Sequence, residues 1–380
     1  MTIAFNKPYL SGDEFRYMQD AQQRGHLSGD GWYTEQCQAW MTDLTGAASA
    51  LLTHSCTAAL EMSALLLNLS KGDEVIMPSY TFVSTANAFV LQGAVPVFVD
   101  IREDTLNINE ELIEQAISER TRAIVPVHYA GVACEMDSIL DIAGKYDLRV
   151  IEDAAQAVYS SYNGRTLGGL GDLGAFSFHE TKNIISGEGG ALLVNNSVYL
   201  ERAEILREKG TNRSGFKRGL VDKYTWVDKG SSFLPGEMVA AFLYAQTQHV
   251  KKISERRLAI WNLYHDSLAE LESRGALRRP SIPEGCAHNG HMYYILLPDN
   301  KKRNALLEYL KQKSIQSVFH YIPLHNSPAG KLYSKTHTQL PCTESVSARV
   351  LRLPLHMELA DEDVDVVVQA INDWERDRKS

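Results

Sequence analysis

Between Ala47 and Val194, short apolar runs alternate with helical patterns, and this alternation constrains the fold more than any other feature of the sequence. Near-continuous apolar strands joined by helices are typical of a doubly wound α/β domain, whose mainly parallel sheet is buried on both faces. The expected strands are 49–52, 74–77, 95–99, 123–127, 149–151, 174–178 and 191–194. The expected helices between them are 57–69, 84–92, 109–117 and 137–146.

The pattern changes in the second half of the chain. A helix is expected at 199–209, then a loop rich in Gly, Lys and Arg at 210–229, then a long helical stretch at 236–274. From Pro280 onward the pattern indicates a smaller α+β unit, with strands at 291–296 and 317–320 and helices at 303–313 and 361–376. We therefore expect two domains, a large one over residues 1–240 and a small C-terminal one over residues 241–380, which suits the length of 380 residues.

Charge and composition exclude several classes of partner. The formal net charge is −9 and no dense Lys/Arg tract occurs, which argues against nucleic acid and against an anionic membrane. The N-terminus lacks the basic start and apolar core of a signal peptide, and the longest apolar stretch, 88–100, is interrupted by Gln, Gly and Pro. The 5 cysteines are scattered, with no Cys-x-x-Cys pair for a metal. We expect a cytoplasmic protein with reduced thiols and no metal site.

Polar clusters follow the expected strands at the points where those strands end. Open α/β sheets bind their ligands at the carboxyl ends of the strands, so these clusters predict a site at one edge of one sheet. The clusters are 53–58, 78–82, 128–131, 152–156 and 177–183.

Each cluster has two interpretations when taken alone. Ser55–Thr57 is a helix N-cap or a seat for a phosphate, because free N–H groups and the helix dipole attract anions. Asp153 is a satisfied structural carboxylate or the partner of a protonated heterocyclic nitrogen. Phe82 is a core residue or a platform for a ring, and Lys182 is a snorkelling lysine or an amine that forms a Schiff base. Together, the functional interpretations match the requirements of pyridoxal 5'-phosphate.

Three motifs carry a resemblance to a known family. They are Pro78-Ser79-Tyr80-Thr81-Phe82-Val83-Ser84-Thr85, Glu152-Asp153-Ala154-Ala155-Gln156, and Ser177-Phe178-His179 followed by Lys182. They are similar to the central motifs of the DegT-type sugar-nucleotide aminotransferases, and the resemblance covers nearly the whole chain. It implies the pyridoxal-phosphate-dependent fold type I of aspartate aminotransferase.

The resemblance also implies roles for individual residues. Lys182 corresponds to the lysine that holds pyridoxal phosphate covalently as an aldimine, and Asp153 to the partner of the pyridine nitrogen. Both are therefore the expected catalytic residues. The remaining cofactor contacts implied are Gln156 with the ring hydroxyl, Phe82 stacked on the ring, and Thr57, Ala58 and Ser177 with the phosphate.

Family members form homodimers with active sites at the interface, and many place an asparagine of the second subunit near the cofactor phosphate. The corresponding stretch here, residues 230–234, has no asparagine, and Ser232 is the candidate substitute. A homodimer with shared sites is the expected assembly.

Other segments are similar to one branch of the family, which aminates a dTDP-4-keto-6-deoxyhexose with L-glutamate as donor. These segments are 27–31, 128–137, 177–183, 210–214 and 320–325. The branch favours a galacto over a gluco product, a configuration that the sequence itself does not fix, made for bacterial surface polysaccharide or glycoconjugate. The candidate substrate residues are Ser28, Arg213, His320, Tyr321 and His325. A structural hydrogen bond is the alternative for the histidines, and plain solvent exposure is the alternative for the arginine.

Competing functions are separable by sequence or by assay. A dehydrogenase is disfavoured because no Gly-x-Gly-x-x-Gly turn follows the first strand. Relatives that carry histidine in place of the lysine act as dehydratases, and Lys182 argues against that reaction. An aminotransferase acting on a 3-keto sugar nucleotide, and a non-catalytic regulator that binds pyridoxal phosphate, stay open as alternatives.

Overall fold

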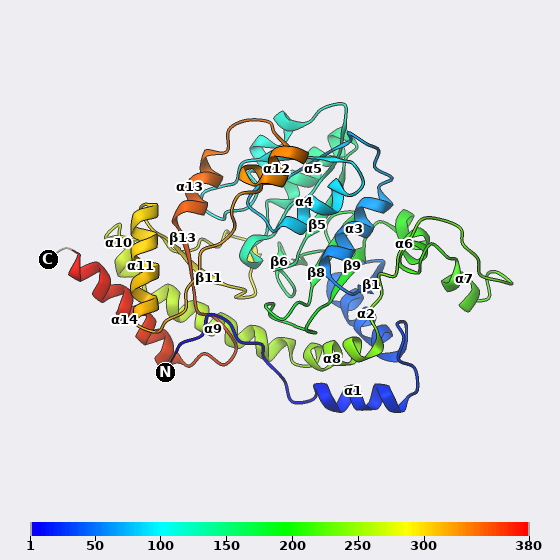
Figure 1. The fold of residues 1–380 in the computed structure, drawn as a ribbon, viewed down its shortest axis with the longest axis horizontal. Helices are drawn as coiled ribbons and strands as arrows, with labels where there is room; N and C mark the ends of the chain where they lie inside the picture. Colours follow the sequence, from blue (N-terminus) through cyan, green and yellow to red (C-terminus); the bar gives the residue numbers. More distant parts are fainter. Residues whose placement is uncertain (1, 379–380) are drawn as a thin grey trace.

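A computed structural model describes residues 2–378, and a large twisted sheet lies at its centre (Figure 1). Within the described residues this sheet has eight strands in the order β1-β9-β8-β5-β4-β2-β3-β12. Strand β9 is antiparallel to both of its neighbours, and every other pair is parallel. The expected mainly parallel sheet is therefore confirmed. Its strands are β1 (Ser49–Thr53), β2 (Glu74–Pro78), β3 (Val95–Val99), β4 (Thr121–Ile124), β5 (Arg149–Asp153), β8 (Leu173–Ser177), β9 (Gly190–Val194) and β12 (Lys335–Thr336).

Both faces of the sheet are covered, because successive side chains of a strand point to opposite faces. In β2, Val75 and Met77 pack into one buried cluster, and Ile76 between them packs into another. The first cluster includes helices α3 (Cys56–Leu66), α4 (Val83–Val90) and α6 (Leu200–Arg207). The second includes α2 (Trp32–Thr45), α5 (Met136–Tyr146) and α8 (Glu237–Thr247). This is the doubly wound arrangement expected from the alternation in the sequence.

A third buried cluster forms from the C-terminal part of the chain. The antiparallel strands β11 (Tyr293–Leu296) and β13 (Val350–Leu353) contribute to it. So do helices α9 (Val250–Ser267), α10 (Ala269–Ser273), α11 (Asn300–Gln312) and α14 (Asp361–Asp377). Ile3 of the N-terminal segment packs into the same cluster. The boundary at residue 240 that the sequence suggests stays a prediction.

The remaining elements are short or peripheral. Strands β6 (Ser161–Tyr162), β7 (Arg165–Thr166) and β10 (Cys286–Ala287) form a small antiparallel sheet. The other helices are α1 (Glu14–Gln23), α7 (Arg213–Lys217), α12 (Pro328–Tyr333) and α13 (Pro341–Arg349). The 3₁₀ turns are η1 (Glu110–Leu112), η2 (Glu114–Ala116), η3 (Tyr129–Gly131), η4 (Ser197–Tyr199) and η5 (Leu324–Asn326). None of the helices described here is long and apolar enough to cross a membrane.

An expected helix at 109–117 and an expected strand at 317–320 were wrong. The expected helix at 109–117 is two 3₁₀ turns, η1 and η2, because the Asn109 side chain accepts the Glu111 N–H at 3.1 Å and the bonds that follow span three residues. The long helical stretch expected at 236–274 is present as α8, α9 and α10, and its first break lies after α8, where the Thr247 hydroxyl donates to the Tyr244 carbonyl oxygen at 2.8 Å. The expected strand at 317–320 is only a bridge between Val318 and Arg352.

The segment after that bridge turns sharply toward the sheet. Tyr321 has a backbone angle φ of +37°, in the left-handed region that bulky residues rarely adopt. The turn stacks the rings of His320 and Tyr321, whose centroids are 3.6 Å apart. A strand continuing through these residues would have separated the two rings, so the turn decides where they lie.

Candidate active site

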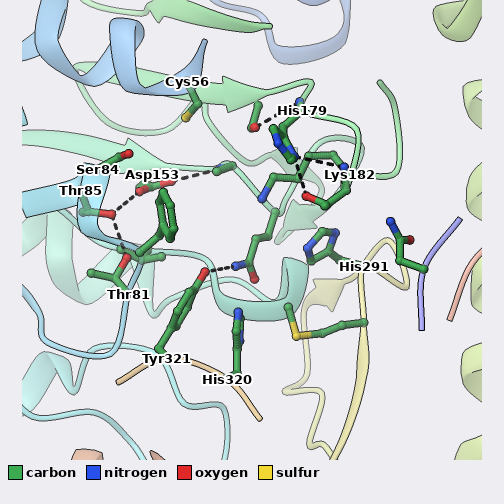
Figure 2. A pocket seen from close by; sticks show the side chains of 18 of the residues that line it. Cys56, Thr81, Ser84, Thr85, Asp153, His179, Lys182, His291, His320 and Tyr321 are labelled. Atoms are coloured by element: carbon green, nitrogen blue, oxygen red, sulfur yellow. Dashed lines mark hydrogen bonds between the residues drawn. The ribbon is translucent and has the colours of Figure 1, made fainter. Parts of the chain in front are cut away.

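A cavity of about 660 Å³ lies at the edge of the large sheet where its parallel strands end. Most of the polar clusters expected at this edge contribute side chains to its wall (Figure 2). They contribute Ser55, Cys56 and Thr57 after β1, Thr81 and Phe82 after β2, Asp153 and Gln156 at the end of β5, and Ser177, His179, Thr181 and Lys182 at the end of β8. No residue of the cluster at 128–131 lines the cavity, although the preceding Val127 does.

Asp153 ends strand β5 as a buried carboxylate, only 5% exposed. Its Oδ2 accepts a hydrogen bond from the Thr85 hydroxyl at 2.7 Å, and its Oδ1 accepts one from the Ala155 N–H at 3.2 Å. The Thr85 hydroxyl in turn lies 2.8 Å from that of Thr81. These bonds fix the orientation of the carboxylate and leave lone pairs free to accept a further hydrogen bond.

Lys182 follows β8, and its backbone N–H donates to the His179 carbonyl oxygen at 2.9 Å. Burial lowers the pKa of its ammonium, and the carboxylate of Asp153 opposes that shift. No hydrogen bond or ion pair with another described residue holds the side-chain nitrogen, which lines the cavity together with Asp153 (Figure 2). A partly desolvated amine is neutral more often than an exposed one, so it is a better nucleophile.

Helix α3 begins at the cavity and supplies a place for an anion. Its N-cap, Ser55, accepts the Ala58 N–H at 3.1 Å, and the Thr57 hydroxyl lies 2.7 Å from that of Ser84. A Cβ at Gly190 would approach the Cys56 nitrogen to 2.3 Å, so only glycine allows β9 to begin this close to the helix. Thr57 and the nearby Ser177 line the cavity. The Ala58 side chain is buried in the cluster beneath it, and only its N–H belongs to the helix terminus.

Gln156 and Phe82 occupy different positions around the cavity. The Gln156 side chain accepts the Ala130 N–H at 2.7 Å and donates to the Tyr321 hydroxyl at 3.0 Å. Phe82 is 57% exposed, which is unusual for a core residue, and its ring centroid lies 6.5 Å from that of Tyr321. An exposed aromatic face on the wall of a cavity is suited to stack on a planar ring.

Of the candidate substrate histidines, only His320 lines the cavity. His320 and Tyr321 both lie on its wall. His325 lies outside it, where its Nδ1 is 2.7 Å from the Ser79 hydroxyl oxygen and its Nε2 is 3.3 Å from Glu344 Oε1. Its contacts therefore connect the end of β2 to the C-terminal part of the chain.

Two further candidates also lie away from the cavity wall. Ser28 is exposed, and its hydroxyl is 3.3 Å from Nε2 of His26. Arg213 begins the short helix α7, where its guanidinium lies 3.6 Å from Glu208 Oε2. The structure does not bring these two residues together with Lys182 within this chain.

Several residues that line the cavity were not predicted from the sequence. Arg257 comes from α9, His291 and Met292 from the segment before β11, and Arg352 from β13. Phe5 and Asn6 of the N-terminal segment also line the cavity. None of them lies in a polar cluster after a strand of the large sheet, so no local signal marked them.

A buried pair lies behind the cavity wall. His128 and Glu152, which are adjacent in sequence to the cavity residues Val127 and Asp153, are fully buried. Nε2 of His128 lies 3.0 Å from Oε2 of Glu152. His128 Nδ1 accepts the Cys134 N–H at 3.2 Å, so Nε2 carries the ring proton and donates it to Glu152. Glu152 also accepts backbone N–H groups from residues 168, 170 and 171. The pair thus supports β5 directly beside Asp153.

The residues present fit pyridoxal phosphate. The cavity combines a buried carboxylate with free lone pairs, an amine without a hydrogen-bond partner among the described residues, an exposed aromatic face and a helix N-terminus. These are the groups that a cationic ring nitrogen, an aldehyde, a planar ring and a phosphate require.

Comparisons with known proteins agree with this chemistry. Residues 8–372 match the DegT/DnrJ/EryC1/StrS aminotransferase family. The uncharacterized protein MJ1066 of Methanocaldococcus jannaschii is 40% identical over 86% of each chain. The spore coat polysaccharide biosynthesis protein SpsC of Bacillus subtilis is 33% identical over 98% of this chain and 96% of its own. The crystal structure of the aminotransferase TlmJ from Streptoalloteichus hindustanus superposes with a TM-score of 0.91, at 28% identity and 100% coverage of both chains.

The match spans most of the sequence, and the superposition confirms the expected fold type I. The chain therefore belongs to the DegT/DnrJ/EryC1/StrS aminotransferase family, whose cofactor is pyridoxal phosphate.

Proposed function

We propose that this enzyme transfers the amino group of L-glutamate to the C4 ketone of a dTDP-4-keto-6-deoxyhexose. The products are 2-oxoglutarate and a dTDP-4-amino-4,6-dideoxyhexose of galacto configuration. The amino group and the ketone oxygen exchange carriers, so the atoms and electrons of the two substrates balance. One observation carries the proposal, namely that Lys182 and Asp153 line one cavity with the N-terminus of α3.

The roles of the cofactor residues follow from their positions. Asp153 would hold a proton on the ring nitrogen, and Lys182 would hold the aldehyde carbon through its amine. Thr57, Ser177 and the N–H groups at the start of α3 would hold the phosphate, and the Ala58 N–H would be shared between the phosphate and the Ser55 hydroxyl. Phe82 would stack on the ring, and Gln156 would contact the ring hydroxyl.

Lys182 would have a second role, as an acid–base group, after the amino donor binds. When bound, pyridoxal phosphate withdraws electrons from the Cα of the donor and so makes the Cα proton acidic. Lys182 Nζ is then free to move that proton, and a positioned acid–base group accelerates such a step by roughly 10²–10⁴. The shift of its pKa by burial favours the neutral amine that this step needs.

The sugar-binding residues are proposed on two grounds. His320 and Tyr321 line the cavity and come from the segment that resembles the sugar pocket of the dTDP-4-keto-6-deoxyhexose branch. SpsC, to which this chain is 33% identical, is a polysaccharide biosynthesis protein, and this agrees with a product destined for surface polysaccharide. His325 would act through its bond to Ser79 rather than by touching the sugar.

A second copy of the chain would complete the site. The segment 210–229 projects from the body of the molecule (Figure 1) and exposes large apolar side chains, among them Leu220 at 71% and Trp226 at 79%. Arg213 begins helix α7 in this segment and would meet the nucleotide diphosphate of a neighbouring subunit, with Ser28 and Ser232 near the same interface. The proposed assembly is a homodimer that exchanges these segments.

Incubation of the cofactor-loaded enzyme with dTDP-4-keto-6-deoxyglucose and L-glutamate tests the proposal. NMR of the product assigns the carbon that carries the new amine and its configuration. We expect an axial amine at C4. Amination of a 3-keto isomer alone would favour the C3 enzyme, and an absence of amine transfer to either sugar would favour a regulatory protein that binds the cofactor.

A further inference from the structure

Two arginines line the cavity without a carboxylate partner. Arg257 is only 4% exposed, and its Nε and Nη2 donate to the backbone carbonyl oxygens of Gly290, His291 and Leu355 at 3.1, 2.7 and 3.3 Å. Carbonyl oxygens satisfy hydrogen-bond donors but do not neutralise a charge. Within residues 2–378, no ion pair joins this guanidinium to an aspartate or a glutamate.

Arg352 is less completely satisfied. Its Nη2 donates to the Phe319 carbonyl oxygen at 3.2 Å, while its Nε is buried without a hydrogen-bond partner. The Phe5 ring covers one face of the guanidinium, with 4.9 Å from Cζ to the ring centroid. Among the described carboxylates none forms an ion pair with Arg352 either. The planar group therefore has one covered face, a buried Nε without a partner and an Nη1 without a described hydrogen bond, and its side chain lines the cavity.

A buried arginine elsewhere in the chain shows the usual arrangement. Arg207 is 3% exposed, and its guanidinium forms an ion pair with Asp30. Burial of an unpaired charge is costly, and proteins normally compensate it with a counter-charge. Burial lowers the pKa of Arg257 to about 9, which still leaves it charged at neutral pH. The described residues therefore supply no counter-anion to either of the two cavity arginines.

The arginines lie on the Lys182 side of the cavity. Lys182, Arg257 and Arg352 line the same cavity as His291, and their positive charges add to the lowering of the His291 pKa by burial, so all three cations lie near this imidazole. Figure 2 shows His291 and His320 across the cavity from Cys56 at the start of α3. The cofactor phosphate proposed for α3 is therefore not the missing anion.

We propose that Arg352 binds a carboxylate of the amino donor and that Arg257 adds positive charge at the same end of the cavity. The inference rests on the proposed function and names the binding site for its donor. The fork of a guanidinium matches a carboxylate through two parallel hydrogen bonds.

The chemistry of the two substrates favours the donor over the nucleotide sugar. In an amino acid, the carboxylate is bonded to the same Cα as the nitrogen that is exchanged at Lys182. In a 4-keto sugar nucleotide, the ring of the sugar separates the diphosphate from the reacting C4. An anion bound beside Lys182 is therefore the donor's carboxylate.

Calorimetric titration of the cofactor-loaded enzyme with glutarate tests the inference. Glutarate has both carboxylates of glutamate but no amine, so it binds without reacting. We expect Arg352→Gln to weaken glutarate binding by roughly 10- to 150-fold, the range for a hydrogen bond to a charged group. Arg352→Lys keeps the charge without the fork, and we expect it to restore part of the affinity. Binding of dTDP should be unchanged in both variants.

Arg303→Gln is the matched control. The Arg303 guanidinium lies 5.5 Å from the ring centroid of Phe319, close to the same segment, but does not line the cavity. We expect this variant to bind glutarate as the wild type does. Equal glutarate affinity in Arg352→Gln and Arg303→Gln would overturn the inference, as would a loss of dTDP binding in place of glutarate binding, or a wild type that binds no glutarate.

The proposed function can fail separately. A wild type that binds glutarate through Arg352 but aminates no dTDP-4-keto sugar would leave the donor site standing and remove only the proposed acceptor. Thermal unfolding and cofactor absorbance of each variant, compared with those of the wild type, show that the fold is intact. If Arg352→Gln does not fold, the comparison of Arg352→Lys with Arg303→Lys decides in its place.

Discussion

The cavity has two walls that the chain builds in different ways. The cofactor wall consists of the strand-end segments 55–57, 81–85, 153–156 and 177–182 of the large sheet, and the C-terminal wall consists of Arg257, His291, His320, Tyr321 and Arg352. On the cofactor wall, polar groups bond to one another, as Asp153 does to Thr85. On the C-terminal wall, two cations have no described carboxylate partner. In the proposed function, the first wall would hold the cofactor and the second would supply positive charge to the substrates.

Removal of the amine from the cofactor wall should have the largest effect. We expect Lys182→Ala to lower kcat by up to about 10⁴-fold, because the amine would act as the acid–base group of a proton transfer that such a group accelerates by roughly 10²–10⁴. The visible absorbance of the lysine-bound cofactor should disappear as well. Lys145→Ala, at an exposed lysine paired with Glu114, is the control. Normal turnover of Lys182→Ala without added amine would contradict the assignment.

Neutralisation of the carboxylate on the same wall should come next. We expect Asp153→Asn to slow the half-reaction with L-glutamate by about 100-fold, since an amide cannot hold a proton on the ring nitrogen as an anion does. Thr85→Val removes only the hydroxyl that orients the carboxylate, and about a tenfold loss is expected. Rapid-mixing absorbance measurements give both rates. An Asp153→Asn rate within twofold of the wild type would show that this carboxylate is structural.

A substitution at Glu152 tests the structural support of the cofactor wall rather than its chemistry. Its buried carboxylate accepts backbone N–H groups of residues 168, 170 and 171 at 2.6–2.7 Å and the Nε2–H of His128. In Glu152→Gln the new amide group would face one of these donors. We expect a loss of about 1.5–3 kcal/mol in the free energy of unfolding, measured by urea denaturation of the cofactor-free protein. Glu111→Gln, at an exposed site, should change it little.

The same contrast explains what could be predicted from the sequence. The cofactor wall is local, because each polar cluster directly follows an apolar strand, so Asp153, Gln156 and Lys182 were all found beside the cavity that the pattern predicts. Even there, the sequence did not distinguish side chains that face the cavity from those that face away. Glu152 is adjacent to Asp153, yet it points into the buried layer, because successive side chains of a strand alternate.

The C-terminal wall depends on packing between distant segments. Arg257 lies on a helix, and Arg352 lies on a strand that pairs with β11 rather than with the large sheet. A lone arginine in an amphipathic helix or strand looks the same whether it faces solvent or a cavity. The prediction of a strand at 317–320 was wrong for a related reason. The turn at Tyr321 brings this residue to Gln156, which is distant in the sequence, and stacks its ring on that of His320, and neither contact is visible in the local sequence pattern.

The smallest effect expected tests whether the C-terminal wall is also preorganised. The Tyr129 hydroxyl lies 2.8 Å from His320 Nδ1, and the Tyr80 hydroxyl donates to the His320 carbonyl oxygen at 3.2 Å. Burial lowers the pKa of His320, and the charges of Arg352 and Lys182 add to that shift, so the imidazole is neutral at pH 7. A hydroxyl proton donated to Nδ1 leaves the ring proton on Nε2, and Figure 2 shows this ring directed toward the cavity.

In Tyr129→Phe the proton is free to move to Nδ1, and the wall then loses a donor toward the sugar. We expect kcat/KM for the sugar nucleotide to fall by roughly 3- to 10-fold, the worth of one neutral hydrogen bond, with no change in glutarate affinity. The ¹⁵N chemical shifts of the imidazole should report the altered tautomer. Tyr294→Phe, in the same buried cluster, is the control. An unchanged tautomer and an unchanged kcat/KM in Tyr129→Phe would mean that His320 is fixed by its packing against Tyr321 alone. The C-terminal wall would then differ from the cofactor wall, because hydrogen bonds would not support its donors.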